Sequence, residues 1–243
     1  MHQQLDCLPG PIPTGIRHVA VAGIVATDAE LDHTLGIVLL REARYLQLYA
    51  TQAVRRILER DSRILPVTRA FAQVEITEMV LEAEVPLRYR DGAASGISVL
   101  PFEVPAGPPR FAGEDTSGHT VGLILRDEAS GGSCAYVPGC GQLAGPLLER
   151  LGETDLLLFD GTFWTDDELI SLGIGDRRAR EMDHQPVSGP DGSLSQLAGL
   201  PRPTKVYTHI NNTNPMLLEA SPEREQVEAA GIVVGYDGMS FSI

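Results

Sequence analysis

The stretch GIVATDAELDHTLGIVLLRE, residues 23–42, is the feature that most constrains what this chain can fold into. An apolar strand-like run leads into Asp28, Glu30, Asp32 and His33, and an apolar helical run follows at once. A chain that only buries its core has no need for so many titratable groups in so short a span. In α/β folds, ligands bind where strands end. The stretch therefore predicts a polar, ligand-binding strand end.

Apolar runs typical of buried strands alternate with helical segments along most of the chain. Strands are predicted at 18–26, 45–51, 154–161, 204–211 and 232–243, and helices at 33–43, 51–61, 141–152, 165–173, 193–200 and 221–231. The runs at 74–92 and 97–105 alternate as antiparallel strands do, and 119–139 is typical of a hairpin. This order predicts an α/β fold in one domain, residues 1–243, with two mixed sheets and helices outside.

Capping residues predict where the helices begin. The predicted starts are Asp32 or Thr34 for 33–43, Thr165 with Glu168 for 165–173, Ser193 with Gln196 for 193–200, and Ser221 with Pro222 for 221–231. Proline suits the first helical position because the backbone N–H that it lacks would have no partner there.

The composition narrows the choice of partners. A net charge of −14 repels a nucleic-acid backbone or an anionic membrane, so neither is expected as a partner. No apolar run reaches membrane-spanning length, and MHQQLDCLPGPIP lacks the features of a signal peptide. A cytoplasmic location is therefore expected. Cys7, Cys134 and Cys140 lack the close pairing of a zinc knuckle and are expected to be reduced thiols in or near the core.

Several other strand ends finish in an imidazole or a carboxylate. His119 opens the predicted hairpin, Asp160 ends one strand and His209 ends another. Each has an ordinary structural explanation, such as a turn before Gly161 for Asp160 or a backbone hydrogen bond for His209. The recurrence of such residues at separate strand ends favours a metal site instead.

The order of these residues resembles a known family. TDAELDHTLG has the frame of the metallo-β-lactamase metal motif, Thr-His-x-His-x-Asp-His, with Asp28 and Glu30 in place of the two early histidines. YVPGCGQL, LLLFDGTFWTDDE, EMDHQPVSGPDG, THINNTNPML and GIVVGYDGMSFSI resemble one branch, the pyrroloquinoline quinone (PQQ) biosynthesis protein B (PqqB) family. The resemblance covers nearly the whole chain and implies an αβ/βα sandwich.

Members of that branch carry a further N-terminal segment before the region that matches MHQQL, with a Gly-rich apolar opening and a cysteine-rich zinc motif. The domain is therefore expected to be incomplete at its N-terminus and to lack its first strands. We expect either a misplaced gene start or a shortened homologue, and we favour the first. An exposed sheet edge would follow, and the oligomeric state, a homodimer included, is left open.

The ligand set separates this chain from a hydrolytic zinc enzyme, which relies on several histidines. The resemblance implies Asp32, His33, Asp160 and His209 as metal ligands, with His119 as a weaker candidate. Two imidazoles and one carboxylate leave open positions that suit ferrous iron and dioxygen. Zinc is the alternative metal. Asp28 and Glu30 are expected to be ligands, partners that fix His33, or catalytic contacts to the substrate.

The segment MDHQPVSGPDG is expected to form a loop over the site, where His184 could act as acid or base on a phenol or be solvated. Asn211, Asn212 and Asn214 offer amides to a substrate carboxylate, or else form a turn before Pro215.

The resemblance implies an iron-dependent hydroxylase that adds oxygen to the tyrosine ring of a peptide-derived Glu-Tyr precursor of PQQ. Its expected partners are this small substrate and dioxygen. Two alternatives stay open, namely a zinc hydrolase and a non-catalytic carrier of PQQ or its precursor toward the periplasm.

Overall fold

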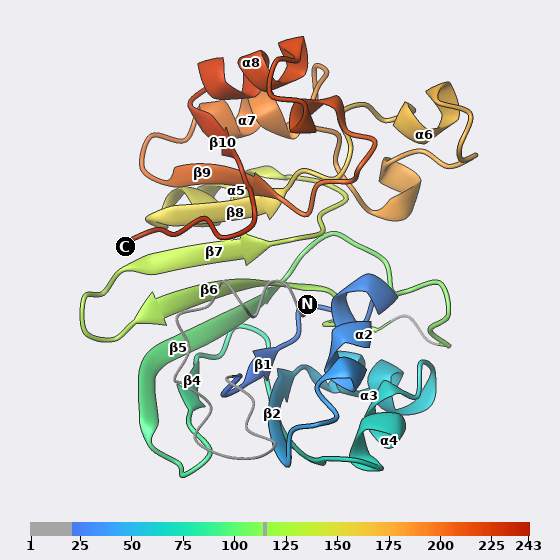
Figure 1. Cartoon of the computed structure of the whole chain (residues 1–243). Helices are drawn as coiled ribbons and strands as arrows, with labels where there is room; N and C mark the ends of the chain where they lie inside the picture. The colour runs from blue at the N-terminus through green and yellow to red at the C-terminus, as the bar shows by residue number, and fades with distance from the viewer. Residues whose placement is uncertain (1–20, 114–115) are drawn as a thin grey trace. The chain divides into compact units, whose positions relative to one another are not determined.

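The structure is a computed structural model that describes residues 21–113 and 116–243. It divides into two compact units (Figure 1), each described by itself. The N-terminal unit runs to Glu103 and also includes 107–121, and the C-terminal unit consists of 104–106 and 122–243. The expectation of a single domain stays a prediction.

A parallel three-stranded sheet organises the N-terminal unit. Its order is β1 (Ile24–Val25), β2 (Tyr45–Ala50) and β3 (Gln73–Glu78). Its helices are α2 (Leu31–Leu39), α3 (Gln52–Arg60) and α4 (Ile64–Arg69). Val54, Ile57 and Leu58 form the apolar stripe of α3 and pack in one core cluster with Leu48 of β2. Helical periodicity thus places α3 against the sheet.

The start of the 74–92 run differs from the prediction. β3 pairs in parallel with β2, and only β4 (Val85–Arg88) and β5 (Ala94–Glu103) form the predicted antiparallel pair. The reason is topological, because α3 and α4 connect β2 to β3, and a crossover of that kind returns the chain in the same direction.

The C-terminal unit contains five paired strands, the first of which, β6, begins one residue before the stretch 122–243 of that unit. They are β6 (Val121–Asp127), β7 (Ser133–Val137), β8 (Leu156–Asp160), β9 (Thr204–Thr208) and β10 (Ile232–Val234). The order is β10-β9-β8-β7-β6. The predicted hairpin is confirmed as the antiparallel β6–β7 pair, and β7 to β10 run parallel. The carboxyl ends of β8 and β9 therefore lie at one edge of the sheet.

Helices flank these strands in Figure 1. They are α5 (Gly145–Gly152), α6 (Glu168–Ser171), α7 (Ser193–Ala198) and α8 (Pro222–Ala229), with 3₁₀ helices η1 (Arg180–Met182) and η2 (Pro215–Leu217). The start of α8 is confirmed, since the Ser221 hydroxyl accepts from the Arg224 N–H at 3.1 Å and Pro222 is the first helical residue.

Three predicted helix starts were wrong. Glu30 caps α2 in place of Asp32 or Thr34, and Asp32 lies inside the first turn. Asp167 precedes α6, because the Glu168 carboxylate accepts from the Trp164 N–H at 2.6 Å and so leaves the predicted capping box. Gly192 precedes α7, since the Ser193 hydroxyl pairs with the Tyr207 hydroxyl at 2.9 Å.

Two expectations from composition can be compared with the described residues. Cys134 and Cys140 are buried free thiols, as predicted, and burial raises their pKa to about 11 and about 12. Cys7 lies outside the described residues. None of the described helices is both long and apolar enough to cross a membrane.

Candidate metal centre

Asp160, the last residue of β8, is the centre of a polar cluster inside the C-terminal unit. Its side chain is fully buried. Oδ1 accepts from the Thr162 hydroxyl at 2.6 Å and from the Thr162 N–H at 3.1 Å. Oδ2 accepts from the Cys140 N–H at 3.3 Å and lies 2.7 Å from His184 Nδ1. The four lone-pair sites of the carboxylate are thus occupied.

The surroundings of Asp160 keep it ionised. Burial by itself raises its pKa, but the charges and hydrogen bonds of His184 and His209 outweigh burial and lower the pKa to about 2. A buried carboxylate is stable when donors surround it in this way. A metal bound directly to Asp160 would have to displace one of these donors.

His184 reaches Asp160 from a distant part of the chain. It follows η1, and the loop after it is fixed by the Gln185 N–H, which donates to the Cys140 carbonyl at 2.7 Å. Phe163 meets the His184 ring edge-on, with centroids 5.8 Å apart. Because Asp160 is ionised, His184 Nδ1 carries the proton and donates it. Its Nε2 then holds a lone pair for a metal or a proton.

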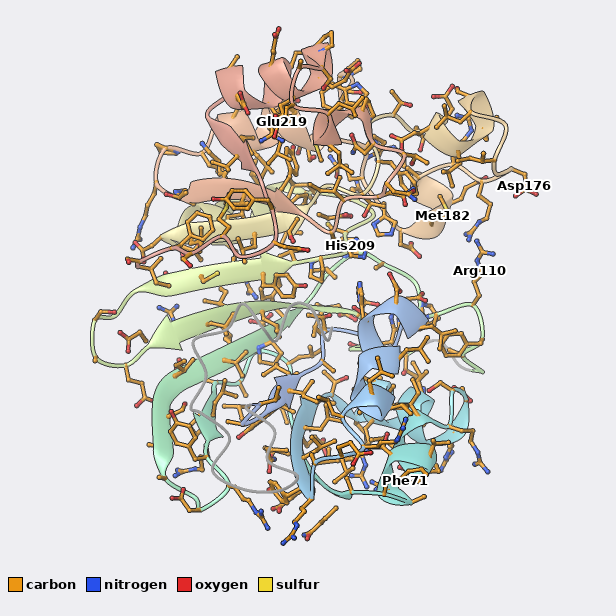
Figure 2. The ribbon with its side chains drawn as sticks, viewed as in Figure 1. Phe71, Arg110, Asp176, Met182, His209 and Glu219 are labelled. Carbon is orange, nitrogen blue, oxygen red and sulfur yellow. The ribbon has the colours of Figure 1, made fainter. Side chains whose placement is uncertain are left out.

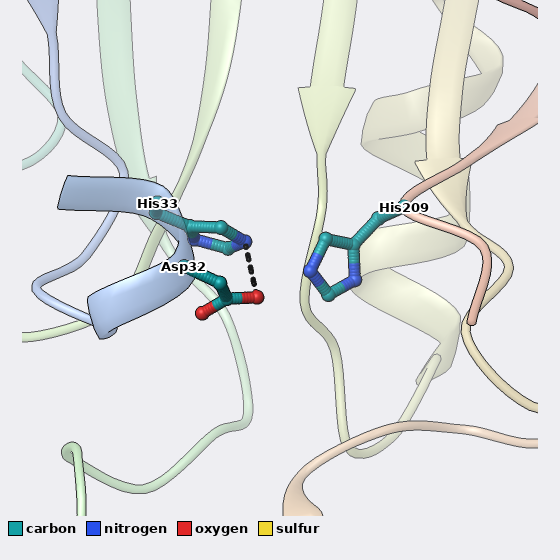
Figure 3. A group of neighbouring side chains, drawn as sticks. All are labelled: Asp32, His33 and His209. Carbon is teal, nitrogen blue, oxygen red and sulfur yellow. Dashed lines mark ion pairs between the residues drawn. The ribbon is translucent and has the colours of Figure 1, made fainter. Parts of the chain in front are cut away.

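His209 follows β9 (Figures 2 and 3) and has the left-handed φ of 54° that few non-glycine residues adopt. Its Nδ1 lies 2.7 Å from the Thr162 hydroxyl oxygen and 3.7 Å from Asp160 Oδ1. Its ring stacks on that of His184 with centroids 5.4 Å apart.

One potential ligand atom from each of three residues lies within 4.8 Å of the other two, and these residues are Asp160, His184 and His209. Nitrogen and carboxylate oxygen donors in this combination suit zinc or ferrous iron. The sequence placed Asp160 and His209 together at strand ends. His184 was predicted from sequence to act as an acid or base on a loop, not as a neighbour of Asp160. Thr162 was not predicted, although a polar residue two positions after the aspartate that ends the strand could have indicated it.

A second aspartate–histidine pair lies inside the N-terminal unit. Asp28 is 4% exposed and both of its oxygens lie 2.8 Å from His33 Nδ1. The Thr27 hydroxyl and the Glu30 N–H also donate to it. Burial raises the pKa of Asp28, but His33 and these donors together lower it below its ordinary value. Of the alternatives considered from sequence, this geometry matches a partner that fixes His33.

The other acidic residues of the opening stretch are more exposed. Asp32 is 70% exposed, and its Oδ2 lies 3.8 Å from His33 Nε2 (Figure 3). Glu30 precedes α2 and its carbonyl accepts from the Thr34 hydroxyl at 2.7 Å. His119 is buried before β6, with Nδ1 3.2 Å from the Thr120 hydroxyl. Two predictions remain untested: that Asp32, His33 and His119 bind a metal, and that Glu30 has a catalytic role.

The asparagines after His209 have different surroundings. Asn214 is 1% exposed; its amide donates to the Gly161 carbonyl at 2.9 Å and its oxygen accepts from the Met216 N–H. This is the turn before Pro215 that was the alternative to substrate binding. Asn211 donates to the Thr213 hydroxyl at 2.7 Å, and Asn212 is exposed. Contact of Asn211, Asn212 and Asn214 with a substrate stays a prediction.

Comparison with known proteins identifies the family. Residues 1–210 match the Beta-lactamase superfamily domain. Coenzyme PQQ synthesis protein B of Bradyrhizobium diazoefficiens is 35% identical over 98% of this chain and 79% of that protein. The protein of the same name from Rhizobium meliloti is 40% identical over 93% and 73%. The chain belongs to the PqqB family.

Solved structures agree with this assignment. Zinc-bound PqqB from Methylobacterium extorquens matches with a TM-score of 0.86 and 33% identity, over 100% of this chain and 80% of that one. Human tRNase Z, short form, matches with a TM-score of 0.54 and 19% identity, over 92% and 80%, and shows only the shared fold. The α/β class with two sheets and helices, and the resemblance to PqqB, are confirmed. The named relatives are proteins of PQQ synthesis.

Proposed function

We propose that this protein acts in PQQ synthesis as an iron- and oxygen-dependent hydroxylase of the tyrosine ring in a peptide-derived Glu-Tyr precursor. The observation that carries the proposal is the buried, ionised Asp160 with the imidazoles of His184 and His209 beside it. Two imidazoles and a carboxylate are the donor types found in non-haem ferrous sites, and the set proposed here is His209 with His33 and Asp32. Family membership supports the pathway, and the cluster contributes His209 as a ligand and His184 as a proton carrier.

His209 is the member of the cluster that is open to a metal ion, because the Asp160 carboxylate is fully hydrogen-bonded and His184 is assigned to proton transfer. We assign His209 Nε2 to the ion, because Nδ1 faces the Thr162 hydroxyl at 2.7 Å. Asp32 and His33 remain the further ligands predicted from sequence. When bound, a ferrous ion would activate dioxygen, and hydroxylation of the ring would also need a two-electron reductant that converts the second oxygen atom to water.

We assign His184 to proton transfer on the phenol of the substrate. Asp160 fixes its ring through Nδ1 at 2.7 Å, which is the arrangement of an oriented general base. Its Nε2 cannot hold a metal and carry a proton at the same time. The metal content of His184→Ala therefore separates the two roles, since a proton carrier can be removed without loss of the ion.

The test begins with anaerobic reconstitution. The protein should bind about one ferrous ion per chain, and oxygen uptake with a Glu-Tyr peptide and an added reductant such as ascorbate should follow the iron content. His209→Ala should lose the ion and keep a near-native thermal melt, because the deletion opens no apolar cavity. His33→Ala should also lose the ion, and its melting temperature should fall, because buried Asp28 loses its imidazole partner. His184→Ala should keep the ion and lose oxygen uptake. Full metal content in His209→Ala would remove the basis for this site.

Zinc is the second candidate metal, because the M. extorquens protein is described as zinc-bound. The zinc-loaded protein could hydrolyse esters or lactams while the iron-loaded protein consumes no oxygen. That result would show that the protein is a hydrolase and not a hydroxylase. Tight binding of PQQ with no turnover under either metal would indicate a carrier.

A further inference from the structure

Thr162 joins Asp160 to His209 through a single hydroxyl group. The side chain is 6% exposed, so water does not replace these contacts. Its Oγ1 lies 2.6 Å from Asp160 Oδ1, 2.7 Å from His209 Nδ1 and 2.9 Å from the His209 carbonyl oxygen. Two of the three neighbours accept hydrogen bonds only, and the ring nitrogen can donate or accept.

The hydroxyl has one proton for these three neighbours. The carboxylate is the closest acceptor, and a hydrogen bond to an ionised acceptor is stronger than one to a neutral acceptor. If the proton pointed at His209 Nδ1 instead, two bare oxygens would face each other at 2.6 Å in a buried site. The hydroxyl proton therefore points at the charged and closer Asp160 oxygen, at 2.6 Å, rather than at the neutral His209 carbonyl at 2.9 Å. His209 Nδ1 then donates to a lone pair of Thr162.

We propose that Thr162 is a positioning residue that fixes His209 in the tautomer with Nδ1 protonated and Nε2 unprotonated. Asp160 thus orients both histidines, His184 directly and His209 through the threonine hydroxyl. A histidine whose second nitrogen donates toward a carboxylate is held in orientation and is a more basic ligand. Thr162 lies in the stretch DGTFW that follows β8, and its proposed role is to present His209 Nε2.

The backbone of Thr162 supports the same histidine. Its carbonyl accepts from the Asn211 N–H at 3.1 Å, and the preceding Gly161 N–H donates to the Thr208 carbonyl at 2.8 Å. These contacts lie on both sides of His209, whose left-handed φ needs such support.

The first measurement uses the metal-free protein. Nitrogen-15 imidazole spectra at about pH 8.5, where histidine is neutral, distinguish the two tautomers. The His209 signal is assigned by its loss in His209→Gln. The wild-type ring should be protonated at Nδ1. A ring protonated at Nε2 in the wild type overturns the proposal without any variant of Thr162.

Thr162→Val and Thr162→Ser test the hydroxyl. Valine keeps the shape and lacks the hydroxyl, so its His209 ring should shift to the other tautomer or a mixture, and zinc affinity should fall by roughly 10–100-fold. Serine should restore both readouts. Thr154→Val is the matched control, because that buried hydroxyl donates to the Leu151 carbonyl at 2.8 Å and meets no histidine.

Unchanged tautomer and zinc affinity in Thr162→Val, with a native melt, would also overturn the proposal. The affinity measurement rests on the proposed metal site, and the tautomer measurement does not. Protein that shows the expected tautomer and binds neither zinc nor iron would refute the proposed function and leave the role of Thr162 standing.

Discussion

At the residue scale, two buried aspartates each hold a histidine by Nδ1. Asp28 holds His33 at 2.8 Å in the N-terminal unit, and Asp160 holds His184 at 2.7 Å in the C-terminal unit. In both pairs burial disfavours the carboxylate charge, and the imidazole with nearby donors more than compensates for it. In each pair the Nδ1 nitrogen faces the buried aspartate, so Nε2 is the ring nitrogen directed away from that carboxylate.

The depressed pKa of Asp160 predicts a pH dependence of stability in the metal-free protein. The folded pKa of about 2 lies below the ordinary value of 3.8. The carboxylate therefore stabilises the folded state above about pH 4, and this contribution is lost as the pH falls toward about 2. Its size is on the order of 2 kcal/mol. Urea unfolding at several pH values in this range measures it.

Asp160→Asn is the comparison, because asparagine keeps the size of the side chain and does not ionise. Its free energy of unfolding should be lower than that of the wild type near pH 6 and should fall less steeply as the solution is acidified. Parallel pH profiles for the two proteins would contradict the assignment of this stability to Asp160.

At the element scale, β8 and β9 approach each other closely at Gly161. A Cβ there would lie 2.8 Å from Met216 Cε and 2.9 Å from Tyr207 Cβ. Both neighbours are buried, so they cannot move aside into solvent. Glycine at this position lets the strand ends come together and brings Asp160 next to the loop that carries His209.

Gly161→Ala should therefore destabilise the protein. Overpacking of this kind costs about 1–3 kcal/mol, and each kcal/mol lowers the melting temperature by roughly 2–4 °C in a chain of this size. Gly145→Ala is the control, since its Cβ would meet open space and alanine favours the helix. Equal melting temperatures for the two variants would show that the strand ends can separate freely.

At the scale of the whole molecule, the net charge predicts which large partners the protein should not bind. The net charge of −14 predicts no binding to duplex DNA or to phosphatidylserine vesicles even at about 50 mM salt, where attraction to a basic protein would be strong. Fluorescence anisotropy and vesicle sedimentation measure this. Binding to DNA or vesicles that weakens as salt is added would contradict the prediction, because it would indicate a local basic surface on a protein whose net charge is negative.

The sequence by itself determined the family and several of the local elements. Periodicity and capping residues predicted β2, α3, β8, β9 and α8, since these patterns depend on neighbours a few residues apart. They also placed Asp160 and His209 at strand ends. They missed α4, because Ile64–Arg69 is too short to show helical periodicity and begins beside Arg63, whose φ is 61°.

Only the tertiary structure decided the rest. The direction of β3 follows from its crossover connection. His184 contacts Asp160, 24 residues away in the chain, because the Gln185 N–H donates to the Cys140 carbonyl and holds the loop in place. Thr162 became part of the site in the same way, through a hydroxyl that meets a ring 47 residues away. Local patterns carry no record of such long-range pairings, because the residues that meet are set by strand pairing and packing of the whole chain.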